Sequence, residues 1–200
     1  MQVAAQLTPS TASRVAGEII AAYSELRGHY PPAKSSWLWP LALSANETRN
    51  FEALWNNNIG NVTTSGSGNV SYFVNPHVSE PLKFLAFPDL RAGARSMLYY
   101  VNKYGGLDAA DVGDQTGWQR ALDKYLGSPY PPLWGLVAKL DSSVQPDSEH
   151  IISTPERPSG VPFGTILVGI GLATAAGYAA ARWLRQTPPE EHFPDVIVMN

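Results

Sequence analysis

Residues 41–51 read Leu41-Ala-Leu-Ser-Ala-Asn-Glu-Thr-Arg-Asn-Phe51, and the Asn-rich run Trp55-Asn-Asn-Asn-Ile-Gly-Asn61 follows closely. The apolar residues predict a helix that begins between Trp37 and Pro40 and ends near Glu47 or Phe51. The surrounding leucine and phenylalanine side chains would desolvate an acid at this helix end in part. Partial burial raises the pKa of a carboxyl group because it disfavours the anion. Glu47 is therefore the first candidate functional residue, and the alternative is a solvated acid near a helix end.

The composition limits the classes of protein to which the chain can belong. It has 200 residues, 44% of them hydrophobic, with a formal net charge of -3 and a pI near 5.8. A chain of this length and apolar content supports one core of ordinary size. The lack of a broad basic character argues against nucleic acid as a partner. Because the chain has no cysteine, disulfides, thiolate zinc sites and thiol catalysis are excluded.

No metal ion and no cofactor are expected from the sequence. The histidines are dispersed and form no His-Glu-x-x-His pattern. The chain also lacks a phosphate-binding glycine-rich loop with its lysine, and the Gly66-Ser-Gly68 turn lacks the spacing of a nucleophile elbow. The histidines are His29, His77, His150 and His192. These patterns favour a cofactor-free enzyme or a protein without catalytic activity.

The spacing of the apolar residues predicts a mainly α fold of the α+β class. Thr8 before Pro9 is typical of a helix N-cap with proline at the first helical position, and the helix should run to about Arg27. The glycine-rich turn at 65–69, between β-prone segments at 61–64 and 70–74, predicts a small hairpin or flap. Further helices are expected at 89–104, 116–126 and 133–140.

Four short motifs follow one another between residues 39 and 140. They are Glu47-Thr48 after the apolar helix, Asn57-Asn-Ile-Gly60, Phe84-Leu-Ala-Phe87 and Tyr125-Leu-Gly-Ser-Pro129. In this order they resemble the glucosaminidase and flagellar muramidase group of peptidoglycan hydrolases, which have a lysozyme-like fold. The chain departs from that group at Arg49-Asn50, where members often have Gly-Trp, and at Ser128, which replaces an acid.

The resemblance implies catalytic roles for two residues. Glu47 would be the general acid that protonates the glycosidic oxygen, and Tyr125 would assist by hydrogen bonding. The alternative for Tyr125 is a tyrosine at the edge of the core. Glu52 and Glu80 are the nearby candidates for a second acid, and each is also consistent with a surface charge. A single-acid mechanism stays open, in which the acetamido oxygen or the 6-hydroxyl of the substrate is the nucleophile.

Candidate glycan-binding residues occur in the motifs and in the predicted flap. Asparagine amides offer both donors and acceptors to a glycan, and aromatic rings can stack on sugar rings. The alternatives are turn chemistry for the asparagines and core packing for the aromatic residues. The candidates are Asn57, Asn58, Asn61, Tyr72, Phe84 and Phe87.

The C-terminal part of the chain predicts a membrane anchor. Residues 142–160 are polar and contain prolines, as in a linker. Residues 161–184 are apolar over the length needed to cross a hydrocarbon core of roughly 30 Å, and a buried helix is the alternative. Arg182 and Arg185 favour a cytoplasmic C-terminal side. In the tail at 185–200, residues 186–200 are a candidate docking segment for a virion or envelope protein.

These observations divide the chain into an N-terminal helix at 1–35, a lysozyme-like domain at 36–141, a linker, a transmembrane helix and a tail. The expected function is that of a membrane-anchored peptidoglycan hydrolase, with glycan strands and a lipid membrane as partners. The first residues lack the pattern of a secretory signal, whereas the arginines after the span favour a domain outside the cytoplasm. A bacteriophage protein in a virion membrane is one resolution of this conflict, and a bacterial inner-membrane protein is the alternative. The alternative is a non-catalytic glycan-binding or structural virion protein on the same scaffold.

Overall fold

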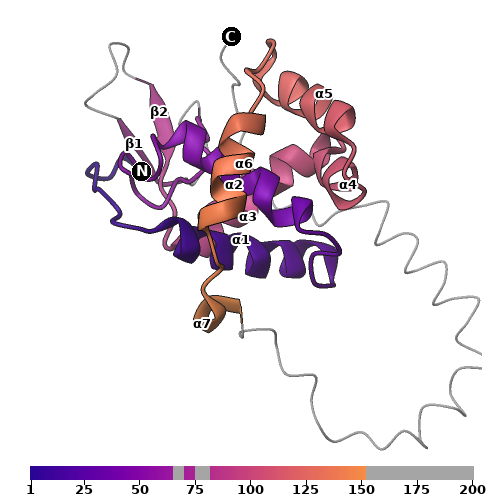
Figure 1. The fold of residues 1–200 in the computed structure, drawn as a ribbon. Coiled ribbons are helices and arrows are strands. Elements are labelled where there is room, and N and C mark those ends of the chain that lie inside the picture. Colours follow the sequence, from indigo (N-terminus) through magenta and orange to yellow (C-terminus); the bar gives the residue numbers. More distant parts are fainter. Residues whose placement is uncertain (65–69, 75–81, 152–200) are drawn as a thin grey trace, which may run out of the picture. The chain divides into compact units, whose positions relative to one another are not determined.

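The computed structural model describes residues 1–64, 70–74 and 82–151 (Figure 1). Glu80, the predicted transmembrane helix at 161–184 and the docking segment at 186–200 lie outside the described residues. Among the residues that are described, no helix is both long enough and apolar enough to cross a membrane. The described residues form helices and one small antiparallel sheet, so the predicted α+β class is confirmed.

The described part of the chain contains seven helices and two strands. The predictions for α2, α3, α5 and α6 are confirmed to within a few residues, whereas α4 was not predicted. In chain order the elements are α1 (Ala12–Arg27), α2 (Ser35–Glu47), β1 (Tyr72–Val74), β2 (Lys83–Leu85), α3 (Leu90–Lys103), α4 (Gly106–Asp111), α5 (Gln115–Leu126), α6 (Trp134–Ser143) and α7 (Ser148–Ile151).

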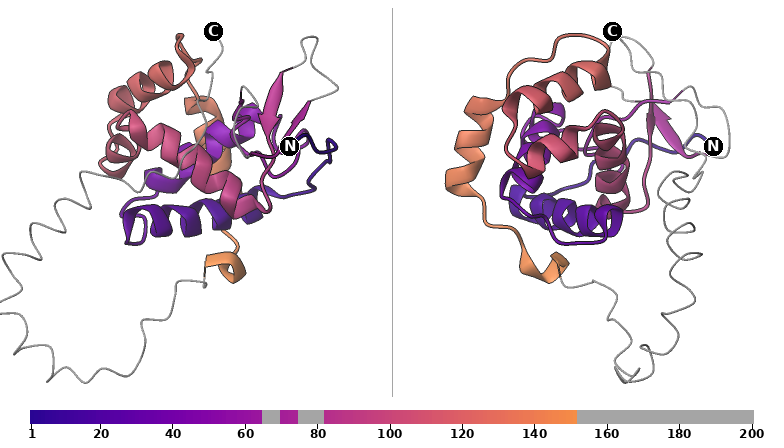
Figure 2. Two further views of the ribbon diagram at one scale, coloured as in Figure 1. Left: turned by 180° about the vertical axis from the view of Figure 1, so that it is seen from behind. Right: turned by 90° about the vertical axis from the view of Figure 1, so that its right-hand side faces the viewer.

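Helix α2 is the centre of the helical part. Every residue from Ser36 to Ala45 is buried, and a helix that is apolar around its circumference must be covered on all sides. Helices α1, α4 and α6 contact it, and Figure 1 shows α6 crossing in front of α2 with α1 beneath both. The two strands lie at one end of the helical part, and α4 and α5 lie at the other (Figure 2). The end of α2 that carries Glu47 is therefore fixed from several directions.

The small sheet differs from the predicted hairpin. Strand β1 pairs with β2, with Phe73 opposite Phe84, rather than with residues 61–64. Residues 62–64 lie along β2 instead, because the Leu85 N–H donates to the Val62 carbonyl at 2.9 Å and the Thr64 N–H donates to the Lys83 carbonyl at 2.9 Å. The prediction missed this because local turn signals carry no information about a strand that arrives later in the chain.

Helix α1 begins at Ala12, so the predicted N-cap at Thr8 is wrong. Thr11 caps the helix instead, since its hydroxyl accepts the Arg14 N–H at 3.2 Å. Thr8 is engaged elsewhere: its N–H donates to the Leu54 carbonyl at 2.8 Å, and its hydroxyl accepts the Asn57 N–H at 3.1 Å. The residues before α1 therefore hold the Asn-rich loop rather than extend the helix.

The packed domain extends beyond the predicted boundary at residue 141. Val144 is buried in the core, and the Asp147 N–H donates to the Ser13 carbonyl at 3.0 Å. Helix α7 contacts α1. Residues 142–151 therefore belong to the folded part, although the prediction assigned them to the linker, and residues 152–160 lie outside the described residues.

We expect Gly93→Ala and Gly135→Ala to have opposite effects on stability. A Cβ atom at Gly93 would lie 1.9 Å from the Asn57 carbonyl oxygen, whereas a Cβ at Gly135 would meet nothing within 4 Å. The first change should lower the free energy of unfolding by about 2 kcal/mol or more through overpacking, and the second should raise it by roughly 0.5–1 kcal/mol. Urea unfolding of the full chain, followed by tryptophan fluorescence, measures both. Equal stability of the two variants would contradict the close approach of α3 to the Asn57 loop.

Candidate active site

Glu47 is the last residue of α2 and lies at the border of the core. Residues 36–45 are buried, Asn46 is exposed, Glu47 is partly buried, and Thr48 after it is fully buried. Thr48 fixes the helix end with one hydroxyl, which donates to the Ser44 carbonyl at 2.7 Å and accepts the Phe51 N–H at 3.2 Å. The carboxyl group of Glu47 therefore extends from a rigid backbone.

The three residues after Thr48 form a left-handed turn. Arg49, Asn50 and Phe51 have φ angles of 49°, 55° and 71°. Left-handed backbone costs roughly 1–2 kcal/mol per residue other than glycine. The burial of Phe51 and the bond from the Asn50 N–H to the Ala45 carbonyl, at 2.7 Å, offset this cost. Such unfavourable backbone is often found at functional sites, and here it directly follows the candidate acid.

The carboxylate of Glu47 is held by side chains from distant parts of the chain. The Tyr130 hydroxyl donates to Oε1 at 2.5 Å, and it accepts a hydrogen bond from Asn46 Nδ2 at 2.5 Å. Asn61 Nδ2 donates to the Glu47 backbone carbonyl and lies 3.4 Å from Oε2. Oε1 thus has a short bond, whereas Oε2 has only a long one.

Burial has the largest effect on the protonation of this site. It raises the pKa of Glu47, while hydrogen bonds from Tyr130, Asn61 and Asn46 act in the opposite direction, and the net shift is upward. Burial also raises the pKa of Tyr130 well above its ordinary value, and the negative charge of Glu47 adds to that shift. Tyr130 therefore stays a neutral phenol that donates its proton to the Glu47 carboxyl group.

Two side chains of α5 position Tyr130 by forming hydrogen bonds with the backbone of that tyrosine. Asp123 Oδ1 accepts the Tyr130 N–H at 2.8 Å, and Gln119 Nε2 donates to the Tyr130 carbonyl at 2.6 Å. Gln119 Nε2 also donates to Asp123 Oδ1 at 3.0 Å. Two side chains one turn apart thus fix the loop residue that contacts Glu47.

Tyr125, the tyrosine singled out from the sequence, lies close to the site but is not bonded to the Glu47 carboxylate. It is buried, and its hydroxyl donates to the Gly60 carbonyl at 3.3 Å. Burial raises its pKa, and the charge of Glu47 contributes to the shift. Tyr125 therefore supports the loop that carries Asn61. The hydroxyl that contacts Glu47 belongs to Tyr130, which the sequence analysis missed although it directly follows the Pro129 of the same motif.

The predicted asparagines differ in the hydrogen-bond partners of their side-chain amides. Asn58 is buried, and its Nδ2 donates to the Val62 and Leu85 carbonyls at 2.9 and 3.0 Å while its Oδ1 accepts the Val62 N–H at 2.8 Å. Asn57 Nδ2 donates to the Phe87 carbonyl at 2.9 Å. These two amides hold the loop against β2 and the start of α3. Asn61 is the member of the predicted set that contacts Glu47.

The predicted aromatic residues and second acids lie in different environments. Phe84 is buried and stacks on Phe73 with ring centroids 5.7 Å apart, so it belongs to the packing of the sheet. Tyr72 and Phe87 are partly exposed. Glu52 is exposed, and no hydrogen bond joins its carboxylate to another described residue.

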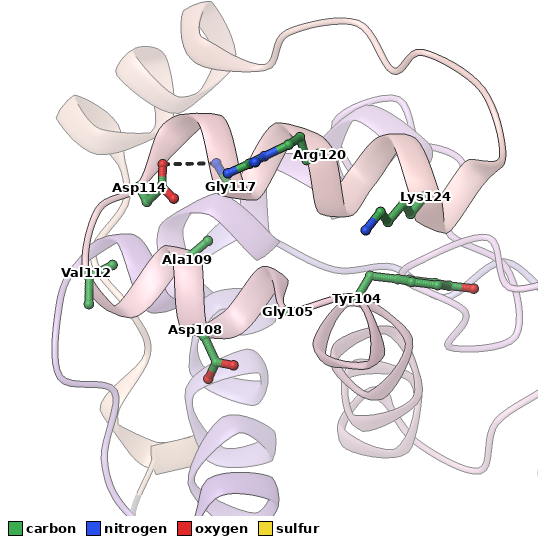
Figure 3. A pocket seen from close by; sticks show the side chains of 9 residues that line it. All are labelled: Tyr104, Gly105, Asp108, Ala109, Val112, Asp114, Gly117, Arg120 and Lys124. Carbon is green, nitrogen blue, oxygen red and sulfur yellow. Dashed lines mark hydrogen bonds between the residues drawn. The ribbon is translucent and has the colours of Figure 1, made fainter.

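The described residues contain no cluster of three or more histidine or acidic side chains able to hold a metal ion. A hollow of about 410 Å³ lies between α4 and α5, and Glu47 is not among the residues that line it (Figure 3).

No protein-family model, curated protein or solved structure matches the chain.

We expect Tyr130→Phe to raise the pKa of Glu47 further. The phenyl ring keeps the burial, but the variant loses the hydrogen bond that stabilises the anion. NMR titration of the side-chain carboxyl carbon of Glu47 measures the shift. Tyr30→Phe, at a residue that is 59% exposed, is the matched control and should leave the titration unchanged. A lower pKa in Tyr130→Phe would show that the phenol does not stabilise the carboxylate.

Proposed function

We propose that the chain is a cofactor-free glycosidase that cleaves the glycan of peptidoglycan, with Glu47 as its general acid and a lysozyme-like arrangement of the domain. One observation carries the proposal: a partly buried glutamic acid with a raised pKa ends the central helix, and its carboxylate is held by Tyr130 and Asn61. Such an acid keeps its proton to higher pH than an exposed glutamic acid does. It is therefore suited to donate that proton to a leaving glycosidic oxygen.

Contacts between the four sequence motifs support the resemblance to the glucosaminidase and flagellar muramidase group. Asn61, directly after the Asn-Asn-Ile-Gly motif, bonds to Glu47. Within that motif, Asn57 bonds to the carbonyl of Phe87, and Gly60 accepts the hydroxyl of Tyr125. Motifs that are scattered over the sequence therefore contact one another in the fold, and Asn61 connects them to the Glu47 carboxyl group.

The hydrogen bonds assign different tasks to the two carboxyl oxygens. Oε1 accepts the short bond from Tyr130, so Oε2 is the oxygen that carries the proton. Transfer of this proton lets the glycosidic oxygen leave as a hydroxyl group while a nucleophile bonds to the anomeric carbon, and Glu47 becomes an anion. The bonds from Tyr130 and Asn61 strengthen as that charge develops, and an interaction that is stronger in the transition state accelerates the reaction.

Two nucleophiles are possible: a second carboxylate of the protein or a group of the substrate itself. Among the described residues, Glu52 is the nearest acid to Glu47 in the sequence, and it is exposed. A route in which the substrate supplies the nucleophile needs no second carboxylate, whether the acetamido oxygen or the 6-hydroxyl attacks. We favour this route because the polar groups that contact the Glu47 carboxylate are a phenol and an amide rather than an acid.

We expect Glu47→Gln to lower glycan cleavage by between about 100-fold and 10,000-fold, the usual contribution of a general acid. Digestion of purified peptidoglycan by the full chain, with products identified by mass, measures the loss. The masses also separate hydrolysis from formation of an anhydro-sugar. Activity in the native chain should fall as pH rises through the raised pKa of Glu47, because only the protonated acid can act.

Two further variants make this test specific. Glu149→Gln changes an exposed acid on α7 and should retain full activity. Glu52→Gln should also cleave at the native rate if the substrate supplies the nucleophile. Unchanged activity in Glu47→Gln would overturn the assignment of the acid, and no cleavage by the native chain would favour a glycan-binding or structural protein on the same scaffold.

The proposed setting of the enzyme is a membrane surface beside the cell wall. Its support is the apolar stretch at 161–184, which is followed by Arg185 and contains Trp183 near its end. We expect the full chain to float with lipid vesicles in a density gradient. Leu172→Arg with Ala176→Arg should abolish flotation, because each arginine at a helix centre costs about 2.5–3.5 kcal/mol of insertion. Equal flotation of both proteins would remove the anchor from the proposal.

A further inference from the structure

A hollow that is open to solvent lies between α4 and α5 (Figure 3). Its volume of about 410 Å³ lies within the range of about 300–1,000 Å³ that is typical of ligand pockets. Its floor is made of Gly105, Ala109 and Gly117, which have no side chain beyond a Cβ atom. The tyrosine ring of Tyr104 closes one end, and Figure 3 shows the Lys124 side chain above that ring.

Close packing of small residues keeps this hollow preformed. A Cβ atom at Gly106 would lie 3.2 Å from the Cβ of Ala121, and one at Gly117 would lie 3.0 Å from the Cβ of Ala109. The backbones of α4 and α5 therefore approach closely, and the space above them is left open. Its lining comes from α4 and α5 and from the short connections at their ends, which contribute Tyr104, Gly105, Val112 and Asp114.

The two acids and the two cations that line the hollow differ in their partners. Its two acids are already engaged, since Asp108 forms an ion pair with Arg27 at 2.6 Å and Asp114 caps α5 by accepting the Gly117 N–H at 3.0 Å. Arg120 and Lys124 make no hydrogen bond or ion pair with any residue in the described part of the chain. Lys124 lies in the last turn of α5, where its positive charge interacts favourably with the negative end of the helix dipole. Arg120 lies in the middle of the helix and gains nothing of that kind.

This combination specifies the chemistry of a ligand. Residues four apart on a helix have Cβ atoms about 5–6 Å apart, so the two cations can reach one oxyanion group together. Arginine and lysine form the strongest hydrogen bonds with carboxylate or phosphate oxygens. The face of Tyr104 offers an apolar wall to a ring. The ligand therefore carries a negative charge next to a ring or another compact apolar group.

We infer that this hollow is a second, non-catalytic glycan site that binds a carboxylate-bearing sugar. The choice of sugar rests on the proposed function, because N-acetylmuramic acid carries a free lactyl carboxylate in peptidoglycan strands from which the stem peptide has been removed. Helix α5 also carries Tyr125, which supports the Glu47 loop from the buried face of the same helix. One rigid helix thus joins the two sites. A peptide-free strand long enough to reach both sites has a higher effective concentration at Glu47.

Titration of the full chain with N-acetylmuramic acid, followed by the backbone amide signals of Tyr104, Gly105 and Gly117, tests the site. N-acetylglucosamine, which lacks the carboxylate, is the matched neutral sugar and should bind at least about tenfold more weakly there, since one charge-assisted hydrogen bond contributes about tenfold in affinity. Arg120→Gln with Lys124→Gln should remove this difference. Arg14→Gln with Lys139→Gln removes the same charge at exposed positions outside the hollow and should preserve it.

The outcomes separate this inference from the proposed function. Binding that needs Arg120 and Lys124 but persists in Glu47→Gln supports the second site, even if the native chain cleaves no glycan. Shifts confined to the Glu47 loop would overturn the second site while leaving the catalytic proposal intact. Equal binding of the two sugars, no binding of either, or equal loss in the two double variants would also overturn it.

Discussion

The burial of α2 over its whole circumference is the constraint on which the rest of the structure depends. Residues 36–45 cannot contact water, so α1, α4 and α6 must surround them. The helix can leave the core only at its end, and Glu47 lies at that point. A partly desolvated acid is thus a consequence of how the core is built. Its raised pKa follows from the same burial that stabilises the domain.

The loops around Glu47 use most of their polar groups to hold their own backbone. Asn58 satisfies three backbone groups, and Asn56 accepts the Gln6 N–H and donates to the Ala4 carbonyl. Irregular backbone near a core needs such partners, because a buried N–H or C=O without one costs as much as a lost hydrogen bond. Asn61 is different, since its amide reaches the carboxylate itself. The Asn-rich run is therefore mainly a scaffold that brings one amide to the acid.

Sequence periodicity was sufficient for the long helices and for the position of Glu47. Apolar spacing places the ends of α2 and α3 to within a few residues, and the structure shows Asp89 capping the start of α3. The pairing of residues 62–64 with β2 could not be predicted, because it depends on a contact between distant segments. Helix α4 escaped notice because six residues are too few to show a periodic pattern. Thr8 has the residue type of a cap, but its bonds to Leu54 and Asn57 prevent that role.

The sequence analysis selected Tyr125 rather than Tyr130 for the same physical reason, because a contact between distant segments decides which hydroxyl meets Glu47. Both tyrosines belong to one short stretch, and the sequence alone cannot state which hydroxyl faces the carboxylate. Helix geometry decides: Tyr125 lies on the buried face of α5, where its hydroxyl meets the Gly60 carbonyl. Tyr130 lies after the helix, where Gln119 and Asp123 form hydrogen bonds with its backbone. In this position its hydroxyl donates to Glu47. The opposite, exposed face of α5 carries Arg120 and Lys124. The same helix therefore supports the loop beside Glu47 through its buried face and carries the two cations of the hollow on its exposed face.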